Sequence, residues 1–175
     1  MAEYHRRAAV AYAHRWAYRR NPMFYNYDEI GGDCTNFASQ VLLAGGADMN
    51  FTPTYGWYYL DANQKAPAWT GVEFLYRFLT STDRGCGPRG EIVPLEQIEP
   101  GDIIQLSFDG QTFTHTPVVV SVGNKADPTD ILVAAHSYDS DNRPLNTYEY
   151  QQLRPIHITE LIPCRAFLSG RGERP

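Results

Sequence analysis

The segment Gly31-Gly32-Asp33-Cys34 places a cysteine just after a flexible glycine pair, at the expected start of a helix. Asp is a preferred N-cap residue, so Cys34 is expected at the first helical position. The unpaired N–H groups and the positive end of the helix dipole favour a thiolate there. We therefore predict that Cys34 is a solvent-reachable nucleophile with a lowered pKa. The same N–H groups could bind the oxyanion that forms when the thiolate attacks a carbonyl.

A cysteine nucleophile needs a base, and two of the five histidines stand at the ends of strand-like runs. His115 opens the run HTPVVV, and His136 ends the run ILVAAH. If these runs pair as neighbouring strands, both imidazoles can face the helix that carries Cys34. Such an arrangement supplies a nucleophile, a base and a group that orients the base.

The third group of this arrangement, which orients the base, is either His136 or Asp139. Side chains alternate along a strand, so His136 shares a face with the small Ala134, which leaves room for the ring of His115. Asp139 is expected in the following turn, where aspartate commonly bonds its own backbone. We therefore choose His136 as the third group and keep Asp139 as the alternative.

Several further residues are candidates for contacts around the nucleophile. Asp33 is expected mainly to cap the helix, with holding the preceding tyrosine loop against Cys34 as its alternative role. Tyr25, Tyr27 and Trp57 are candidates for contacts with substrate, although core packing is the more common use of such rings. The chain contains no Cys-x-x-Cys, His-x-x-x-His or His-Glu-x-x-His spacing and no glycine-rich phosphate loop, so we expect neither a metal nor a cofactor.

The apolar pattern predicts three helices that must position these groups. The first spans 4–20, where Tyr4, Tyr12 and Trp16 recur at helical spacing, and Asn21-Pro22 ends it. The second spans 33–44, and the third spans about 69–80.

After Pro100-Gly101 the spacing of apolar residues changes from that of helices to that of strands. Five short β-branched or alternating runs follow, separated by turn residues: IIQLSF, TPVVVSV, ILVAAH, YEYQQL and PCRAFL. Helices first and strands later predict an α+β fold with an antiparallel sheet.

Length, charge and cysteine count limit the possible domain organisation and partners of the chain. The 175 residues fit a single domain over 1–175, with an N-terminal helix within about 1–22 and a tail or linker over 169–175. The net charge of -5 argues against a nucleic-acid partner, and the absence of a long apolar run argues against membrane insertion. Three cysteines do not suggest a disulfide framework, although one bridge between Cys86 and Cys164 fits an exported protein. We expect a monomer.

The segment from Tyr27 to Gly46, with its DCTNFASQ core, resembles the putative amidase domain family, which is related to NlpC/P60 and CHAP hydrolases. PGDIIQ at 100–105, HTPVVV at 115–120 and AHSYD at 135–139 resemble further motifs of that family, in family order. Pro117 departs from the pattern; it removes a ladder donor and predicts an edge or bulge there. The resemblance implies a papain-like (NlpC/P60-like) fold with Cys34 as nucleophile, His115 as base and His136 as the third polar group.

The resemblance also implies a function, a cysteine-dependent hydrolase of amide bonds in peptidoglycan, acting as amidase or endopeptidase through an acyl-enzyme. Two alternatives stay open: a non-catalytic cell-wall or peptide-binding module, and an acyltransferase that uses the same nucleophile. The family favours a cell-wall or extracellular location. The N-terminus lacks the apolar core of a signal peptide, which also fits a domain fragment, a phage-type lysin or a cytoplasmic protein.

Overall fold

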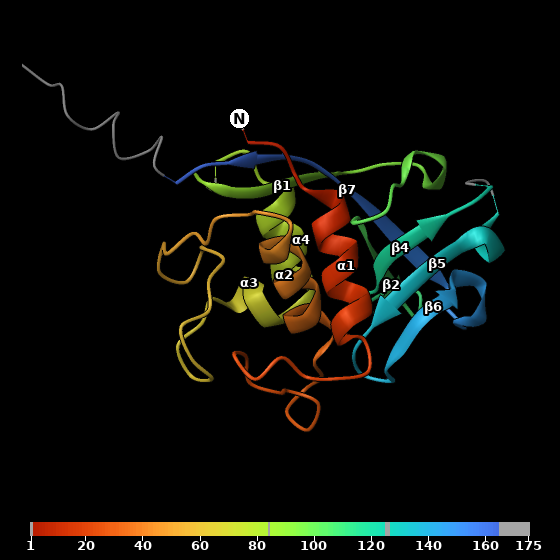
Figure 1. The fold of residues 1–175 in the computed structure, drawn as a ribbon, viewed down its shortest axis with the longest axis horizontal. Coiled ribbons are helices and arrows are strands. Elements are labelled where there is room, and N and C mark those ends of the chain that lie inside the picture. The colour runs from red at the N-terminus through yellow and green to blue at the C-terminus, as the bar shows by residue number, and fades with distance from the viewer. Residues whose placement is uncertain (1, 84, 125–126, 165–175) are drawn as a thin grey trace, which may run out of the picture.

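The computed structural model describes residues 2–83, 85–124 and 127–164, which form an α+β fold with helices packed on a seven-stranded antiparallel sheet (Figure 1). The sheet order is β1-β7-β2-β4-β5-β6, and β3 pairs with β2. The helices are α1 (Arg6–Trp16), α2 (Cys34–Ala44), α3 (Pro67–Thr70) and α4 (Val72–Thr80). The strands are β1 (Gly87–Ile92), β2 (Ile103–Ser107), β3 (Phe113–His115), β4 (Val118–Val122), β5 (Ile131–Ala135), β6 (Ser140–Pro144) and β7 (Gln152–Ile162). Short 3-10 turns occur at Leu95–Gln97, Pro128–Asp130 and Leu145–Thr147.

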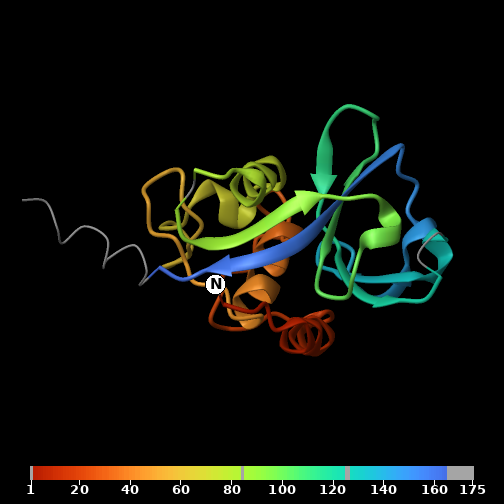
Figure 2. The same ribbon diagram turned by 90° about the horizontal axis from the view of Figure 1, so that it is seen from above.

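Alternating side chains of the central strands build one core on each face of the sheet. Ile103, Val118 and Ala134 pack with the helices. Ile104 and Val119 pack on the opposite face. The long strand β7 runs beside β1 next to the helices and continues beside β2 in the strand-rich half of the fold (Figure 2).

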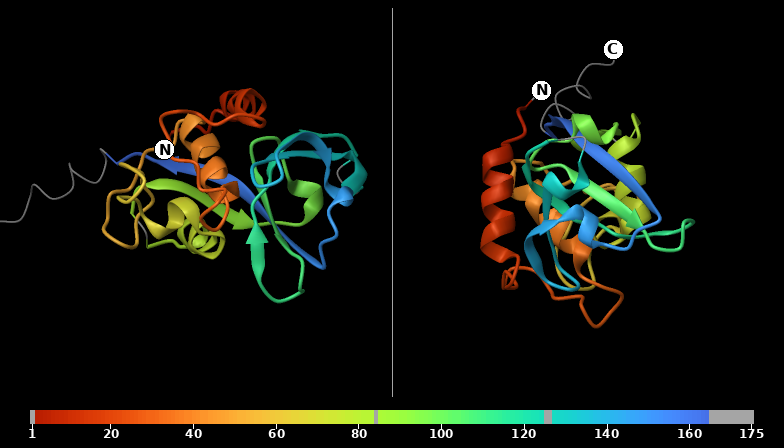
Figure 3. Two further views of the ribbon diagram at one scale, coloured as in Figure 1. Left: turned by 90° about the horizontal axis from the view of Figure 1, so that it is seen from below. Right: turned by 90° about the vertical axis from the view of Figure 1, so that its right-hand side faces the viewer.

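The first two predicted helices form, but α1 ends at Trp16, before the predicted stop at Asn21-Pro22, and it buries an unexpected face. Ala9, Ala13 and Ala17 are fully buried, whereas Tyr12 and Trp16 are only half-buried. The small alanine side chains allow α1 to lie close to the rest of the fold, at the left edge of the right-hand view in Figure 3. The helix predicted over 69–80 is instead two helices, α3 and α4, separated by Gly71 in an extended conformation.

The strand predictions were correct for β2, β4 and β5 and incomplete elsewhere. The sequence pattern missed β1, β3 and β6, and the run predicted over 148–153 is irregular until β7 begins at Gln152. The last predicted run, 163–168, lies largely outside the described residues, as does the expected tail. Strand β1 is rich in Gly and Pro, and Gly90 lies so close to β7 that an added Cβ would stand 2.9 Å from the carbonyl oxygen of His157. Long-range pairing therefore imposes this strand against its local preference.

The predicted break at Pro117 is present. Pro117 lies in the gap between β3 and β4, and β4 is an interior strand rather than an edge. His115 therefore ends a short strand instead of opening a long one.

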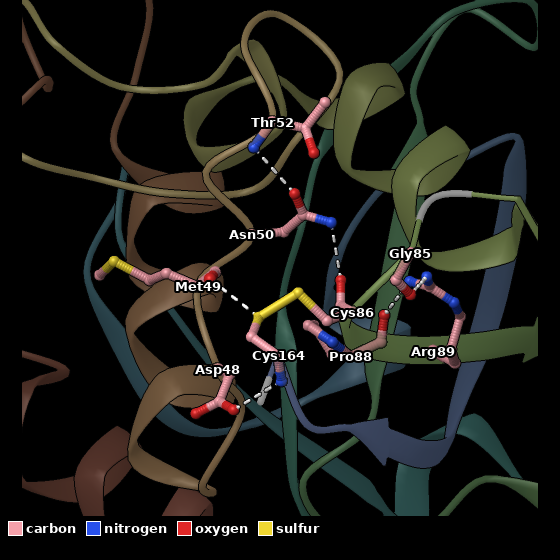
Figure 4. The surroundings of a disulfide bond; sticks show 9 residues. All are labelled: Asp48, Met49, Asn50, Thr52, Gly85, Cys86, Pro88, Arg89 and Cys164. Atoms are coloured by element: carbon pink, nitrogen blue, oxygen red, sulfur yellow. Dashed lines mark hydrogen bonds between the residues drawn. A yellow bond between two sulfur atoms is a disulfide. The ribbon is translucent and has the colours of Figure 1, made fainter. Parts of the chain in front are cut away.

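A disulfide joins Cys86, just before β1, to Cys164, just after β7 (Figure 4). The side chain of Asn50 donates to the Cys86 carbonyl oxygen at 2.8 Å, and the backbone N–H of Cys164 donates to Asp48 at 3.0 Å. All three cysteines lie in the described ranges, and Cys34 is the one that remains free.

Candidate active site

Cys34 is the first residue of α2, as predicted, and the turn before it requires glycine. Gly31 and Gly32 have φ values of 91° and 102°, which residues with a Cβ rarely adopt. This turn brings the chain sharply into the helix. The Cys34 sulfur lies 3.8 Å from the hydroxyl oxygen of Thr35.

The thiol is more buried than the sequence indicates. Only 6% of Cys34 is exposed. Burial raises the pKa of Cys34, although the Thr116 amide and the hydroxyl and amide of Thr35 act in the opposite direction. The prediction of a solvent-reachable thiol with a lowered pKa is therefore wrong for this structure, because removing the sulfur from water outweighs its hydrogen-bond donors.

His115 lies at the end of β3 and is also buried, with 7% of the residue exposed. Its imidazole contacts aromatic rings, with ring centroids 5.4 Å from Tyr148 and 6.4 Å from Phe108. Burial, with a smaller contribution from the positive charge of Arg143, lowers the pKa of His115 to about 4. At neutral pH this imidazole is therefore uncharged and able to accept a proton.

The residue after His115 joins the two halves of the site. The Thr116 hydroxyl lies 3.1 Å from that of Thr35, the residue after Cys34. The fold thus brings β3 against the N-terminus of α2 across 81 residues of sequence. Sequence reasoning missed both threonines; their positions directly after Cys34 and His115 were the available signal.

His136 bonds to the residue before Cys34. Its Nδ1 lies 2.6 Å from Oδ2 of Asp33, its Nε2 lies 2.8 Å from the carbonyl oxygen of Trp16, and its ring stacks on Phe37 at 4.1 Å. Both ring nitrogens are thus engaged, and the ring is fully buried. This differs from the expected pairing of His136 with His115, because β5 lies beside β4 and β6 while β3 pairs with β2.

The Asp33 carboxylate accepts several hydrogen bonds, but it does not cap α2. It stands at the N-cap position of α2, but its carboxylate makes no capping hydrogen bond, so its predicted main role is wrong. Its Oδ1 instead accepts from the backbone N–H of Tyr27 and the side-chain amide of Asn36, each at 2.8 Å. The Asn36 amide also donates to the Tyr25 carbonyl at 2.9 Å. The alternative role, holding the tyrosine loop in place, is the one the structure supports.

Asp139, the alternative third group, lies in an ion-pair cluster around Arg20. The Arg20 guanidinium donates to both Asp139 oxygens at 2.8 and 2.9 Å, and it also pairs with Asp28. A more distant contact of 3.5 Å links Arg20 to Asp33. Asp139 therefore connects to the segment before Cys34 through Arg20.

The three aromatic candidates differ in how much of each side chain is exposed to solvent. Tyr25 is 44% exposed, whereas Tyr27 is buried and its hydroxyl donates to the Ala62 carbonyl at 2.8 Å. Burial, together with smaller electrostatic contributions, raises the pKa of Tyr27 to about 12. Trp57 is fully buried and its indole N–H donates to Ser39 at 3.0 Å, so it is a core residue and not a surface for substrate.

Two other histidines bond carboxylates. His14 contacts Asp141 at 2.8 Å, and His157 contacts Asp102 at 2.8 Å. Within the described ranges, no cluster of three or more His, Cys, Asp or Glu side chains is arranged to hold a metal ion. No helix in that part of the chain combines the length and apolar character needed to cross a membrane.

Comparison with known proteins gives two matches. A family model described as "Putative amidase domain" matches residues 3–159. "Uncharacterized protein YhbB" of Bacillus subtilis (strain 168) is 34% identical over 143 residues, which cover 81% of this chain and 44% of that protein. The chain therefore spans less than half the length of this relative. No solved structure matches the chain.

Proposed function

The chain belongs to the putative amidase domain family, whose description indicates hydrolysis of amides, and on that premise we propose that it hydrolyses amide bonds with Cys34 as nucleophile and His115 as base. The observation that carries the proposal is the 3.1 Å contact between the hydroxyls of Thr35 and Thr116, which sets the residue after His115 against the residue after Cys34. His115 directly precedes Thr116, and its pKa of about 4 leaves the imidazole neutral at pH 7.

The proposed reaction starts from a thiol and a neutral imidazole. His115 accepts the thiol proton as the sulfur attacks the carbonyl carbon of the amide. The N–H groups of the first turn of α2, which no intrahelical carbonyl reaches, stabilise the oxyanion. The C–N bond then breaks, and His115 returns the proton to the departing amine. Water, activated by the same imidazole, hydrolyses the resulting thioester and restores the thiol.

In this scheme His136 acts on the nucleophile rather than on the base. Its bond to Asp33 fixes the residue directly before Cys34, and Asp33 in turn holds the Tyr27 backbone. We therefore keep His136 in the site as a positioning residue. Asp139 supports the same segment through Arg20.

The finer assignment is a papain-like enzyme related to NlpC/P60 and CHAP hydrolases, acting on peptidoglycan. A cysteine at a helix N-terminus, followed along the chain by a histidine on an antiparallel sheet, supports the first part. The peptidoglycan substrate rests on the sequence resemblance. The Cys86–Cys164 disulfide supports a location in an oxidising compartment, such as the cell exterior.

Mass spectrometry of the products of purified peptidoglycan tests this proposal. We expect soluble fragments bearing a new amine and a new carboxylate, whose masses identify the bond that is cut, and none with the Cys34→Ala variant. Products joined to an added amine instead of water would identify an acyltransferase. Binding without any product would identify a non-catalytic wall-binding module and would refute the proposed hydrolase.

A further inference from the structure

A groove of about 520 Å³ opens beside the turn that carries the nucleophile. Gly31 and Gly32 form part of its wall, and Cys34 follows them by two residues. Tyr25 and Ile30, which are 44% and 66% exposed, provide apolar surface at the same groove. The groove therefore lies beside the tyrosine loop and the turn that leads into α2.

The groove carries a single sign of charge. Lys65 contributes an ammonium group to the lining, and the lining residues in the described part of the chain include no carboxylate. The ammonium lies 5.1 Å from the centre of the Tyr27 ring, and the structure gives it no carboxylate partner among the residues it describes. The nearby carboxylate of Asp61 accepts instead from the backbone N–H groups of Asn63 and Gln64.

The backbone that carries Lys65 is also held in place. A bridge pairs Lys65 with Tyr59 across a turn, and the Tyr27 hydroxyl bonds the Ala62 carbonyl of that turn. A half-buried cation fixed above an aromatic ring loses less freedom on binding an anion than a free surface lysine does.

From these observations we propose that the groove binds a carboxylate-bearing peptide portion of the substrate, with Lys65 pairing with the carboxylate and Tyr25 and Ile30 packing against the chain beside it. The inference rests on the proposed amide hydrolysis at Cys34 and specifies its substrate class as an acidic peptide. A charge-assisted hydrogen bond of this kind changes affinity by about tenfold or more.

The test compares purified peptidoglycan with the same material after carbodiimide-driven amidation of its free carboxylates with ammonium. Binding is measured by co-sedimentation with the Cys34→Ala variant, and turnover is measured by amine release with the active chain. Each of three further substitutions is added to Cys34→Ala. Lys65→Met removes the charge, and Lys65→Arg keeps it. Arg7→Met removes a charge from the exposed side of α1 and is the matched control.

We expect amidation to weaken binding of the Cys34→Ala variant by about tenfold. Because the chain is acidic overall, non-specific electrostatics alone would strengthen binding to the amidated material. Lys65→Met should weaken binding to untreated peptidoglycan to a similar extent and remove the discrimination. Lys65→Arg and Arg7→Met should retain the discrimination.

Equal binding to both materials, discrimination that persists in Lys65→Met, or no binding to either material would overturn the inference. The proposed function fails by a separate result. If the chain with Cys34 intact releases no amine from either material while Lys65-dependent binding is present, the hydrolase is refuted and the carboxylate site stands.

Discussion

Nδ1 of His136 lies 2.6 Å from Oδ2 of Asp33, the residue directly before Cys34. Both side chains are almost completely buried, each with 1% exposure. The pair therefore links the end of β5 to the start of α2, and it sets the direction from which the chain enters the helix.

Replacing His136 with Ala should lower the free energy of unfolding by about 3 kcal/mol, because it removes the buried ring that contacts Oδ2 of Asp33 and the carbonyl oxygen of Trp16. The Asp139→Ala variant should lose less than about 1 kcal/mol, since Arg20 keeps its ion pair with Asp28 near the surface. Urea denaturation of both variants measures the difference. Equal losses of unfolding free energy in the two variants would show that the Asp33–His136 bond does not stabilise the fold more than the Asp139–Arg20 ion pair does.

Cys34→Ala and His115→Ala should each reduce turnover of peptidoglycan to background while leaving the far-UV circular dichroism spectrum unchanged. Each substitution removes one member of a unit, so the double variant should be no worse than either single variant. Near-normal turnover by His115→Ala would remove His115 as the base. His157→Gln, which alters a histidine bonded to Asp102, is a matched control and should retain turnover.

The expected pH dependence follows from the pKa shifts of the two proposed catalytic residues, His115 and Cys34. His115 must be neutral to accept a proton, and its pKa is lowered to about 4, so turnover should fall as the pH drops through about 4 and should stay level from about 5 to 7. Burial raises the pKa of Cys34, so iodoacetamide should label it more slowly at pH 7 than it labels free cysteine. Peptide-resolved mass spectrometry across pH measures the labelling. Faster labelling of Cys34 than of free cysteine below pH 7 would contradict the burial of the thiol.

Removing the disulfide should destabilise the fold without altering the chemistry. The bridge spans 78 residues, and closing a loop of that size contributes about 4 kcal/mol in the chain-entropy model. The double variant Cys86→Ser/Cys164→Ser should therefore unfold at lower urea concentration, while its turnover well below the unfolding transition stays unchanged. A large loss of turnover at full folding would instead connect the end of β7 to the active site.

The local part of the site could be predicted from the sequence. The turn at Gly31-Gly32, the helix that begins at Cys34, and the strands β2, β4 and β5 all follow from residue types and spacing within a few positions. Such features depend on backbone conformations and apolar periods that neighbouring residues determine together. The order of helices and then strands likewise indicated an α+β fold.

Only the tertiary structure decided what each polar group bonds. The pairing of β3 with β2 separates His115 from β5, and burial gives Asp33 a histidine partner in place of a capping role. Burial also reverses the expected shift of the Cys34 pKa, since desolvation depends on all the chain segments packed around the sulfur. These outcomes depend on contacts between segments about 80 to 100 residues apart, and one sequence contains no local pattern that specifies them.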